Sequence, residues 1–249
     1  MRSDDIRIVA DLMRRNANRV VAFTGAGISA EVGIPTFRGR GGLWERYNPE
    51  ELATPQAFRR DPELVWRWYA WRMSLIGRAR PGPAHEVLAR WEREGMLMGV
   101  VTQNVDGLHR LAGSVNVVEL HGSIWRLRCT SCGIRRELGF GNIPERIPPV
   151  CDCGSIMRPD VVWFHEPLPP EAWSEAEEMM RRASVVLVIG TSGLVMPAAS
   201  LPIKALERGA ILVEVNPEET SLSGLARFRI RKGAGETLLS IDGYLGGAP

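Results

Sequence analysis

The 249-residue sequence lacks any long hydrophobic segment. Its longest strongly apolar run, residues 185–189, is far shorter than the roughly 20 residues that a helix needs to cross a bilayer. The first residues are acidic and have no apolar core typical of a secretion signal. We therefore expect a cytoplasmic protein with no membrane-bound part.

The sequence is also poor in lysine and nearly balanced in charge. Only Lys204 and Lys232 are lysines among 31 basic residues, and 29 acidic residues leave a net charge of +2. This balance does not indicate a dedicated nucleic-acid-binding protein. With 45% hydrophobic and 24% charged residues, the composition excludes a disordered, collagen-like or coiled-coil chain.

Cysteine is scarce, and all four cysteines lie close together: Cys129, Cys132, Cys151 and Cys153. A secreted disulfide framework usually spreads more cysteines over a shorter chain. Two close pairs are instead typical of a tetrahedral thiolate site. Because four sulfur ligands leave no open position, we predict one structural zinc ion that takes no part in the chemistry.

Predicted strands alternate with predicted helices along the chain. Short apolar runs predict buried strands at residues 19–24, 98–101, 117–120, 185–189 and 211–215, and residues 161–164 are expected to be extended. Amphipathic or charged segments predict helices at residues 4–17, 84–94 and 170–182. This alternation favours an α/β fold with a parallel sheet covered by helices on both faces.

Polar residues or glycine follow each of five strands, beginning at residues 25, 102, 121, 190 and 216. In open α/β sheets, the ligand crevice lies beyond the carboxyl ends of the strands. Five such clusters therefore predict a binding site along one edge of the sheet.

The first cluster, Gly25-x-Gly27-x-x-Ala30, fits a dinucleotide fingerprint. Its first glycine permits a tight turn, the second lets a phosphate approach the backbone, and a small third residue lets helix and strand pack closely. The acidic ribose ligand of a dehydrogenase is missing about twenty residues later, where residues 33–39 form a loop. We expect a nucleotide that is not used for ordinary hydride transfer. Asn216 and Glu218 are either its ribose ligands or parts of a simple turn.

Four histidines occur, and one of them follows a predicted strand at this edge. A general base near neutral pH is most often histidine, so His121 is the first choice. His85 and His109 are expected to be helix or loop histidines with satisfied hydrogen bonds. Asn104 and Asp106 share a short loop suited to holding an amide and a water, or serve only as local caps.

Together these residues resemble the sirtuins, which are NAD-dependent protein lysine deacylases. The motifs occur in family order over nearly the whole chain, at residues 25–29, 33–38, 102–109, 121–122, 158–164, 190–192 and 215–218, together with the four cysteines. The resemblance implies one catalytic domain with a Rossmann-type large lobe at about residues 1–38, 84–125 and 158–249. It also implies a small lobe with a helical module at 39–83 and a zinc-ribbon module at 126–157.

The resemblance implies a role for each matching residue. His121 would be the catalytic base, with Asn104 and Asp106 beside it. The cofactor-binding residues would be Gly25, Ala26, Gly27, Glu31, Phe37, Arg38, Gln103, Asn104, Val105, Asp106, Gly190, Thr191, Ser192, Asn216, Pro217, Glu218 and Ala234. The peptide-binding residues would be Val162, Phe164, His165, Glu166, Leu194 and Val195.

A finer resemblance concerns the acyl group. Ala53, Tyr69 and Arg72, with Thr36, resemble the sirtuin class that removes succinyl and malonyl groups. An acidic acyl chain carries a carboxylate into an apolar tunnel, where the charge must be paired. An arginine fork beside a tyrosine hydroxyl suits that task. The alternative is that Tyr69 and Arg72 are merely neighbours in an aromatic helix.

One residue departs from the family pattern. His165 stands where sirtuins usually have glycine, in a loop that would pass the peptide backbone. A side chain there is expected to affect peptide affinity or preference, and to require a backbone angle that glycine adopts more easily.

The family resemblance implies the products nicotinamide, O-acyl-ADP-ribose and free lysine. The expected partners are acylated-lysine proteins, chromatin- or DNA-associated ones included, without direct sequence-specific binding of nucleic acid. Two other hypotheses stay open from the sequence: a mono-ADP-ribosyltransferase, and a non-catalytic module that binds NAD or acyl-lysine.

Overall fold

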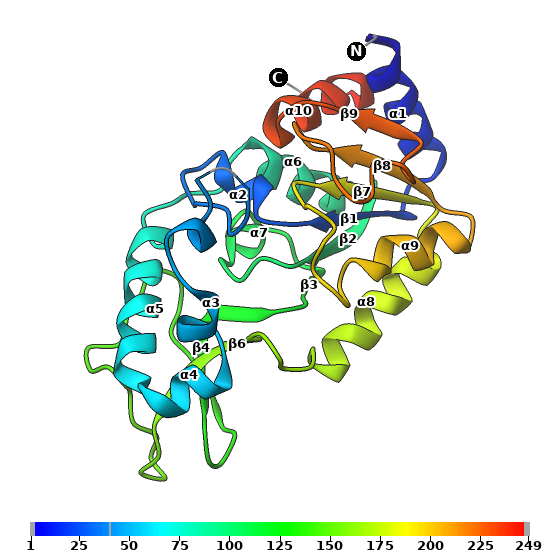
Figure 1. The fold of residues 1–249 in the computed structure, drawn as a ribbon. Helices are drawn as coiled ribbons and strands as arrows, with labels where there is room; N and C mark the ends of the chain where they lie inside the picture. The colour runs from blue at the N-terminus through cyan, green and yellow to red at the C-terminus, as the bar shows by residue number, and fades with distance from the viewer. Residues whose placement is uncertain (1–2, 40, 247–249) are drawn as a thin grey trace.

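A computed structural model describes residues 3–39 and 41–246, and its larger sheet has six parallel strands (Figure 1). The order is β3-β2-β1-β7-β8-β9, which is 3-2-1-4-5-6 when only the strands of this sheet are counted. The strands are β1 (Val20–Thr24), β2 (Leu97–Thr102), β3 (Val117–Glu119), β7 (Val185–Ile189), β8 (Ile211–Val215) and β9 (Phe228–Ile230). This is the Rossmann order, and it confirms the predicted fold class.

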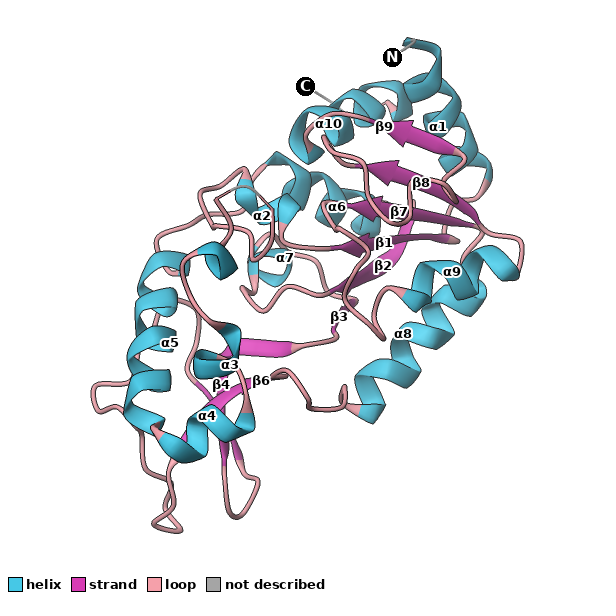
Figure 2. Cartoon of the chain, in the orientation of Figure 1, coloured by secondary structure: helices cyan, strands magenta, loops and turns pink. Residues whose placement is uncertain are grey.

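Helices cover both faces of this sheet (Figure 2). One face packs against α1 (Ser3–Arg15), α6 (Pro83–Arg93) and α10 (Ala234–Leu245), and the other against α8 (Pro170–Arg182) and α9 (Ser200–Glu207). Every residue of β1 and β7 is buried, as expected for central strands covered on both sides. Strand order reverses between these two strands, and the ligand crevice of such folds lies at this point.

A second hydrophobic core lies beside the large sheet. It joins the antiparallel sheet β5-β4-β6 to the short helices η1 (Leu43–Glu45), α3 (Pro49–Leu52) and α4 (Pro55–Arg60) and to α5 (Pro62–Ile76). The strands are β4 (Gly122–Cys129), β5 (Arg135–Glu137) and β6 (Met157–Val161). Asn48, Thr54 and Asp61 cap three successive helices, each followed by a proline, so the sequence starts each helix locally.

The expected strands and helices of the large sheet are present, with ends that match or differ by at most two residues. The extended segment at residues 161–164 is only partly correct, because β6 ends at Val161 and Phe164 lies in a turn. The prediction that the small third residue of the fingerprint, Ala30, lets helix and strand pack closely was wrong. Ala30 ends the single-turn helix α2 (Gly27–Ala30), is exposed and lines a cavity, so it does not mediate helix packing. Among the described residues, no helix has the length and hydropathy of a membrane span.

Candidate functional site

A cavity of about 970 Å³ lies at the carboxyl edge of the large sheet and extends to the second core. Most of the predicted site residues line it. From the predicted cofactor set these are Ala26, Gly27, Glu31, Phe37, Arg38, Gln103, Asn104, Val105, Gly190, Thr191, Ser192, Asn216, Pro217, Glu218 and Ala234. His121 and the predicted substrate residues Ala53, Tyr69, Arg72, Val162, Phe164, His165, Glu166, Leu194 and Val195 line it too. Gly25 and Asp106 lie behind this lining.

The glycines of the first turn allow β1 and β7 to meet closely. Gly25 N–H donates to Ile189 O at 3.0 Å, and Gly27 N–H donates to Gly190 O at 2.8 Å. A Cβ atom on Gly27 would lie 2.7 Å from Gly190 Cα, which no side chain tolerates without a backbone shift. The turn therefore needs glycine for contact with the neighbouring strand, as well as for any approaching phosphate.

Asp106 organises a buried polar network beneath the cavity. Ser29 Oγ donates to Asp106 Oδ2 at 2.8 Å, and Leu108 N–H donates to Oδ1 at 2.9 Å. Asn104 Nδ2 donates to Gly25 O at 3.1 Å and to Ser29 Oγ at 3.2 Å. Asp106 thus fixes Ser29, which in turn holds Asn104 at the cavity wall. Sequence reasoning missed Ser29, and only its place in the glycine-rich turn hinted at it.

The imidazole of His121 is oriented by the backbone. Its Nδ1–H donates to Gln103 O at 2.9 Å, because a carbonyl only accepts, and this bond leaves Nε2 as the basic nitrogen. Burial lowers the pKa of His121, and the bond to Gln103 opposes this shift. The side chain is therefore neutral near pH 7 and available to take a proton.

His85 and His109 lie on helices, in α6 and in α7 (Leu108–Leu111), but the expectation of satisfied hydrogen bonds was wrong for one nitrogen of each. Gly82 N–H donates to His85 Nδ1 at 3.2 Å, and His109 Nε2 lies 3.0 Å from Thr24 Oγ1. The other nitrogen of each ring is buried without a partner among the described residues. The two ring centroids are 4.9 Å apart, so the rings pack against each other, and this leaves no polar partner for those two nitrogens.

Side chains also fix the far end of the cavity. Asn216 Nδ2 donates to Thr191 O at 3.1 Å, and Asn216 Oδ1 accepts from Glu218 N–H at 3.1 Å. The Glu31 carboxylate accepts from the N–H groups of Ala234 and Gly235, where α10 begins. A carboxylate at a helix N-terminus is favoured by the free N–H groups and the helix dipole.

Arg72, predicted as an acyl-binding residue, lies in the cavity wall among aromatic rings. Its side chain lies with the guanidinium carbon 4.6 Å from the Phe37 ring centroid and 5.1 Å from that of Trp68. The residue is only 6% exposed, yet it forms no ion pair or hydrogen bond with a described residue. Burial lowers its pKa, an effect that the neighbouring Tyr69 and Asp106 oppose. An arginine held between aromatic rings still carries charge, and no described carboxylate pairs with this one.

Tyr69 stands beside Arg72 on α5. Its hydroxyl accepts from Trp163 Nε1 at 2.8 Å, which leaves the hydroxyl proton free to donate. Burial is the main cause that raises the pKa of Tyr69, so the hydroxyl stays protonated. Trp163 was not among the predicted site residues, because its contact with Tyr69 joins segments far apart in the chain.

The loop that contains His165 is attached to the helices of the second core. Phe164 N–H donates to Ala53 O at 2.9 Å, and His165 Nε2 lies 3.2 Å from Glu50 Oε1. The φ angle of His165 is +68°, so the residue occupies a left-handed conformation that glycine adopts at no steric cost. This confirms the expected backbone angle, while its effect on peptides stays a prediction.

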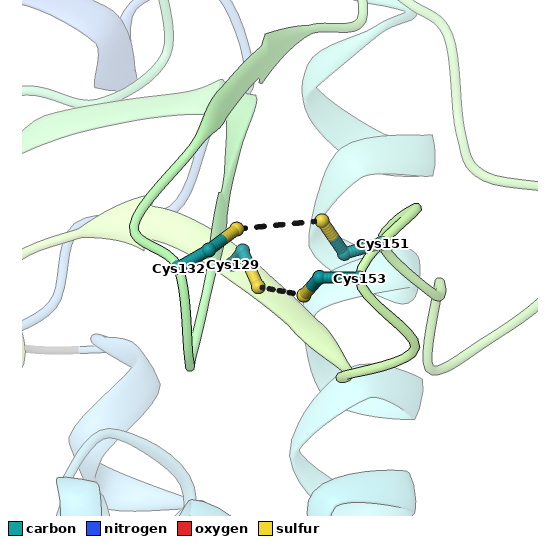
Figure 3. Close-up of side chains that lie close together, drawn as sticks. All are labelled: Cys129, Cys132, Cys151 and Cys153. Carbon is teal, nitrogen blue, oxygen red and sulfur yellow. Dashed lines mark hydrogen bonds between the residues drawn. The ribbon is translucent and has the colours of Figure 1, made fainter.

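The four cysteines form one cluster (Figure 3). Sγ of Cys129 lies 3.5 Å from Sγ of Cys153, and Sγ of Cys132 lies 3.7 Å from Sγ of Cys151. Tetrahedral Zn–S bonds of about 2.3 Å place sulfur atoms about 3.8 Å apart, so this donor set fits zinc. None of the four lines the cavity, which agrees with a structural ion.

Comparison with known proteins identifies the family. The model of the Sir2 family matches residues 25–197. The NAD-dependent protein deacylase 2 of Pyrobaculum aerophilum is 58% identical over 231 residues, which cover 92% of each chain. A solved Sir2 homologue–NAD complex is 50% identical, covers 94% of this chain and 93% of its own, and superimposes with a TM-score of 0.86.

A second solved structure, a Sir2–p53 peptide–NAD⁺ complex, is 33% identical, covers 97% of this chain and 98% of its own, and has a TM-score of 0.86. The chain belongs to the Sir2 family, as the sequence motifs predicted. The residues present fit the cofactor of that family, because the glycine-rich turn, the capped helix start and the polar far end form one continuous cavity.

Proposed function

We propose that this protein is an NAD-dependent protein lysine deacylase that also accepts acidic acyl groups. The products would be nicotinamide, O-acyl-ADP-ribose and free lysine. The single observation that carries the proposal is one cavity with the His121 imidazole, a dinucleotide-type turn and an apolar pocket along its wall. The named activity of its relatives supports the same reaction.

The residues of this cavity suit the proposed chemistry. NAD, when bound, supplies a ribose carbon that loses nicotinamide and a ribose that receives the acyl group. His121 Nε2 is free to take a proton from a hydroxyl, because its Nδ1 is held by Gln103 O. Asn104, fixed by Ser29 and Asp106, presents its side-chain oxygen to a nicotinamide amide or a water. Phe37, Phe164 and Val162 exclude bulk water from the reacting atoms.

Arg72 supports the acidic acyl specificity. A buried guanidinium without a carboxylate partner is unfavourable until an anion reaches it. A succinyl or malonyl carboxylate would accept hydrogen bonds from Arg72 and from the Tyr69 hydroxyl, whose oxygen already accepts from Trp163. An acetyl group would leave the arginine unpaired, so acetyl-lysine is expected to be the slower substrate.

The test compares acetyl, succinyl and malonyl versions of one lysine peptide, with and without NAD. We expect Arg72→Met to lower kcat/KM for the succinyl peptide about 100-fold and for the acetyl peptide less than tenfold, as loss of a charge-assisted contact predicts. Arg67→Met, on the exposed side of the same helix, is the matched control. Equal losses on both peptides would contradict the acyl-carboxylate contact.

The same assay with labelled NAD separates the reaction types. Label in O-acyl-ADP-ribose supports deacylation, and label left on protein identifies ADP-ribosyl transfer. No release of nicotinamide with any acyl peptide would contradict an enzymatic function.

A further inference from the structure

Three arginines lie side by side across the antiparallel sheet of the second core. In the register of β4 with β5, Arg128 pairs with Arg135, and in the register of β4 with β6, Arg128 pairs with Arg158. We call Arg128, Arg135 and Arg158 the arginine row. Like charges directly opposite one another destabilise a sheet, so this row requires compensating anions.

One end of the row is fully compensated. Arg158 donates to both carboxylate oxygens of Glu166, at 2.6 and 2.8 Å, and its guanidinium lies 3.3 Å from the Trp163 ring centroid. Its side chain is buried and makes a further bond to Val161 O. Arg158 is therefore saturated and unavailable to a ligand.

The other two arginines of the row are compensated less completely. Asp160 Oδ2 accepts from Arg126 Nε at 2.6 Å and from Arg135 Nε at 3.0 Å. Arg128 approaches Asp160 only to 3.6 Å and Glu166 to 3.9 Å, and its side chain donates no hydrogen bond within residues 3–39 and 41–246. The side chains of Arg128 and Arg135 are 37% and 57% exposed, so unused N–H groups are accessible.

The arginine row adjoins the loop of residues 162–166, which is predicted to bind the peptide. Glu166, which lies 3.9 Å from Arg128 Nη2, also lines the main cavity, and β6 leads directly into the loop of residues 162–166. We propose that Arg128 and Arg135 bind an acidic segment of the protein substrate next to the acylated lysine. This inference rests on the proposed function and adds a feature of its substrates.

The charges favour an acidic peptide over nucleic acid. Glu137 is exposed beside Arg126, and Asp160 lies between the arginines, so the surface is not continuously basic. A phosphate backbone requires several adjacent cations, whereas a flexible glutamate side chain reaches one guanidinium that has unused N–H groups.

The experiment uses the full-length protein and fluorescein-labelled acetyl-lysine peptides. One pair of peptides carries three glutamates before or after the lysine, and matched peptides carry glutamines. We expect wild-type protein to bind a glutamate peptide about fivefold more tightly at low salt, the size of one or two exposed ion pairs. Added salt should remove the preference.

Arg128→Gln combined with Arg135→Gln should abolish the preference and leave binding of the glutamine peptides unchanged. Arg136→Gln is the matched control, because Arg136 lies on the same strand, is exposed and pairs with Asp152. Retained preference in the double variant, equal loss in the control, or tighter binding of duplex DNA than of the glutamate peptides would overturn the proposal. Binding is measured without NAD, so it does not depend on the reaction. If the wild-type protein prefers glutamate peptides but does not deacylate any peptide, the proposed reaction is contradicted and the proposed binding of acidic segments is not.

Discussion

The two walls of the cavity are built differently. The wall at the large sheet consists of backbone turns and short polar side chains held from behind by a buried network, as Asn104 is held by Ser29 and Asp106. The wall at the second core consists of aromatic rings and one buried arginine. The first wall has little freedom to change, because each group satisfies another. The second has an arginine without a described anionic partner, so under the proposed function it would be the wall that selects the acyl group.

The zinc cluster gives the largest expected effect, since it supports the second wall. Removal of the metal with a strong chelator should unfold the β5-β4-β6 sheet, because structural zinc contributes on the order of 10 kcal/mol to small zinc-dependent folds. A fall in melting temperature and the loss of deacylation should appear together. Unchanged melting in chelator would contradict a structural ion.

His121→Ala tests the first wall directly. Loss of the base should lower kcat by about 100- to 10,000-fold, while NAD binding and melting temperature stay close to wild type. The measurement is single-turnover deacylation alongside NAD titration. A fully active variant would remove His121 from the mechanism.

Asp106→Asn should have an intermediate effect. The amide oxygen still accepts from Leu108 N–H. The amide nitrogen, however, faces Ser29 Oγ as a donor, and Asn104 already donates to that hydroxyl. Loss of this charge-assisted bond should lower kcat/KM about 10- to 100-fold. Glu94→Gln, which changes an exposed carboxylate at the end of α6, serves as the control, and equal effects of the two would argue against the network.

The pH dependence of kcat/KM that His121 causes is the smallest of the expected effects. Because burial lowers the pKa of His121, the active neutral form should persist below the ordinary histidine value of about 6.5. The acid limb of the kcat/KM profile should therefore lie below that value, with activity lost as pH falls through the lowered pKa of His121. An acid limb above it would show that another group controls the reaction.

The sequence predicted the first wall better than the second, for a physical reason. Short apolar runs ending in glycine, histidine or asparagine place their residues at one sheet edge, so His121 and Asn216 could be identified. Ser29 and Trp163 act through contacts between distant segments, which no local pattern encodes. The strand β9 was missed because it has three residues and depends on pairing with β8. The helices α9 and α10 were missed too, and α10 contains glycine in its interior.

Glu31 places a negative charge beside a cavity suited to a dinucleotide, whose phosphates are negative as well. Two backbone amides at the start of α10 hold that charge, and they reduce the repulsion it exerts on an incoming pyrophosphate. The start of α10 would therefore act as an electrostatic shield for the cofactor. Any alteration that unwinds its first turn should weaken nucleotide affinity from outside the cavity.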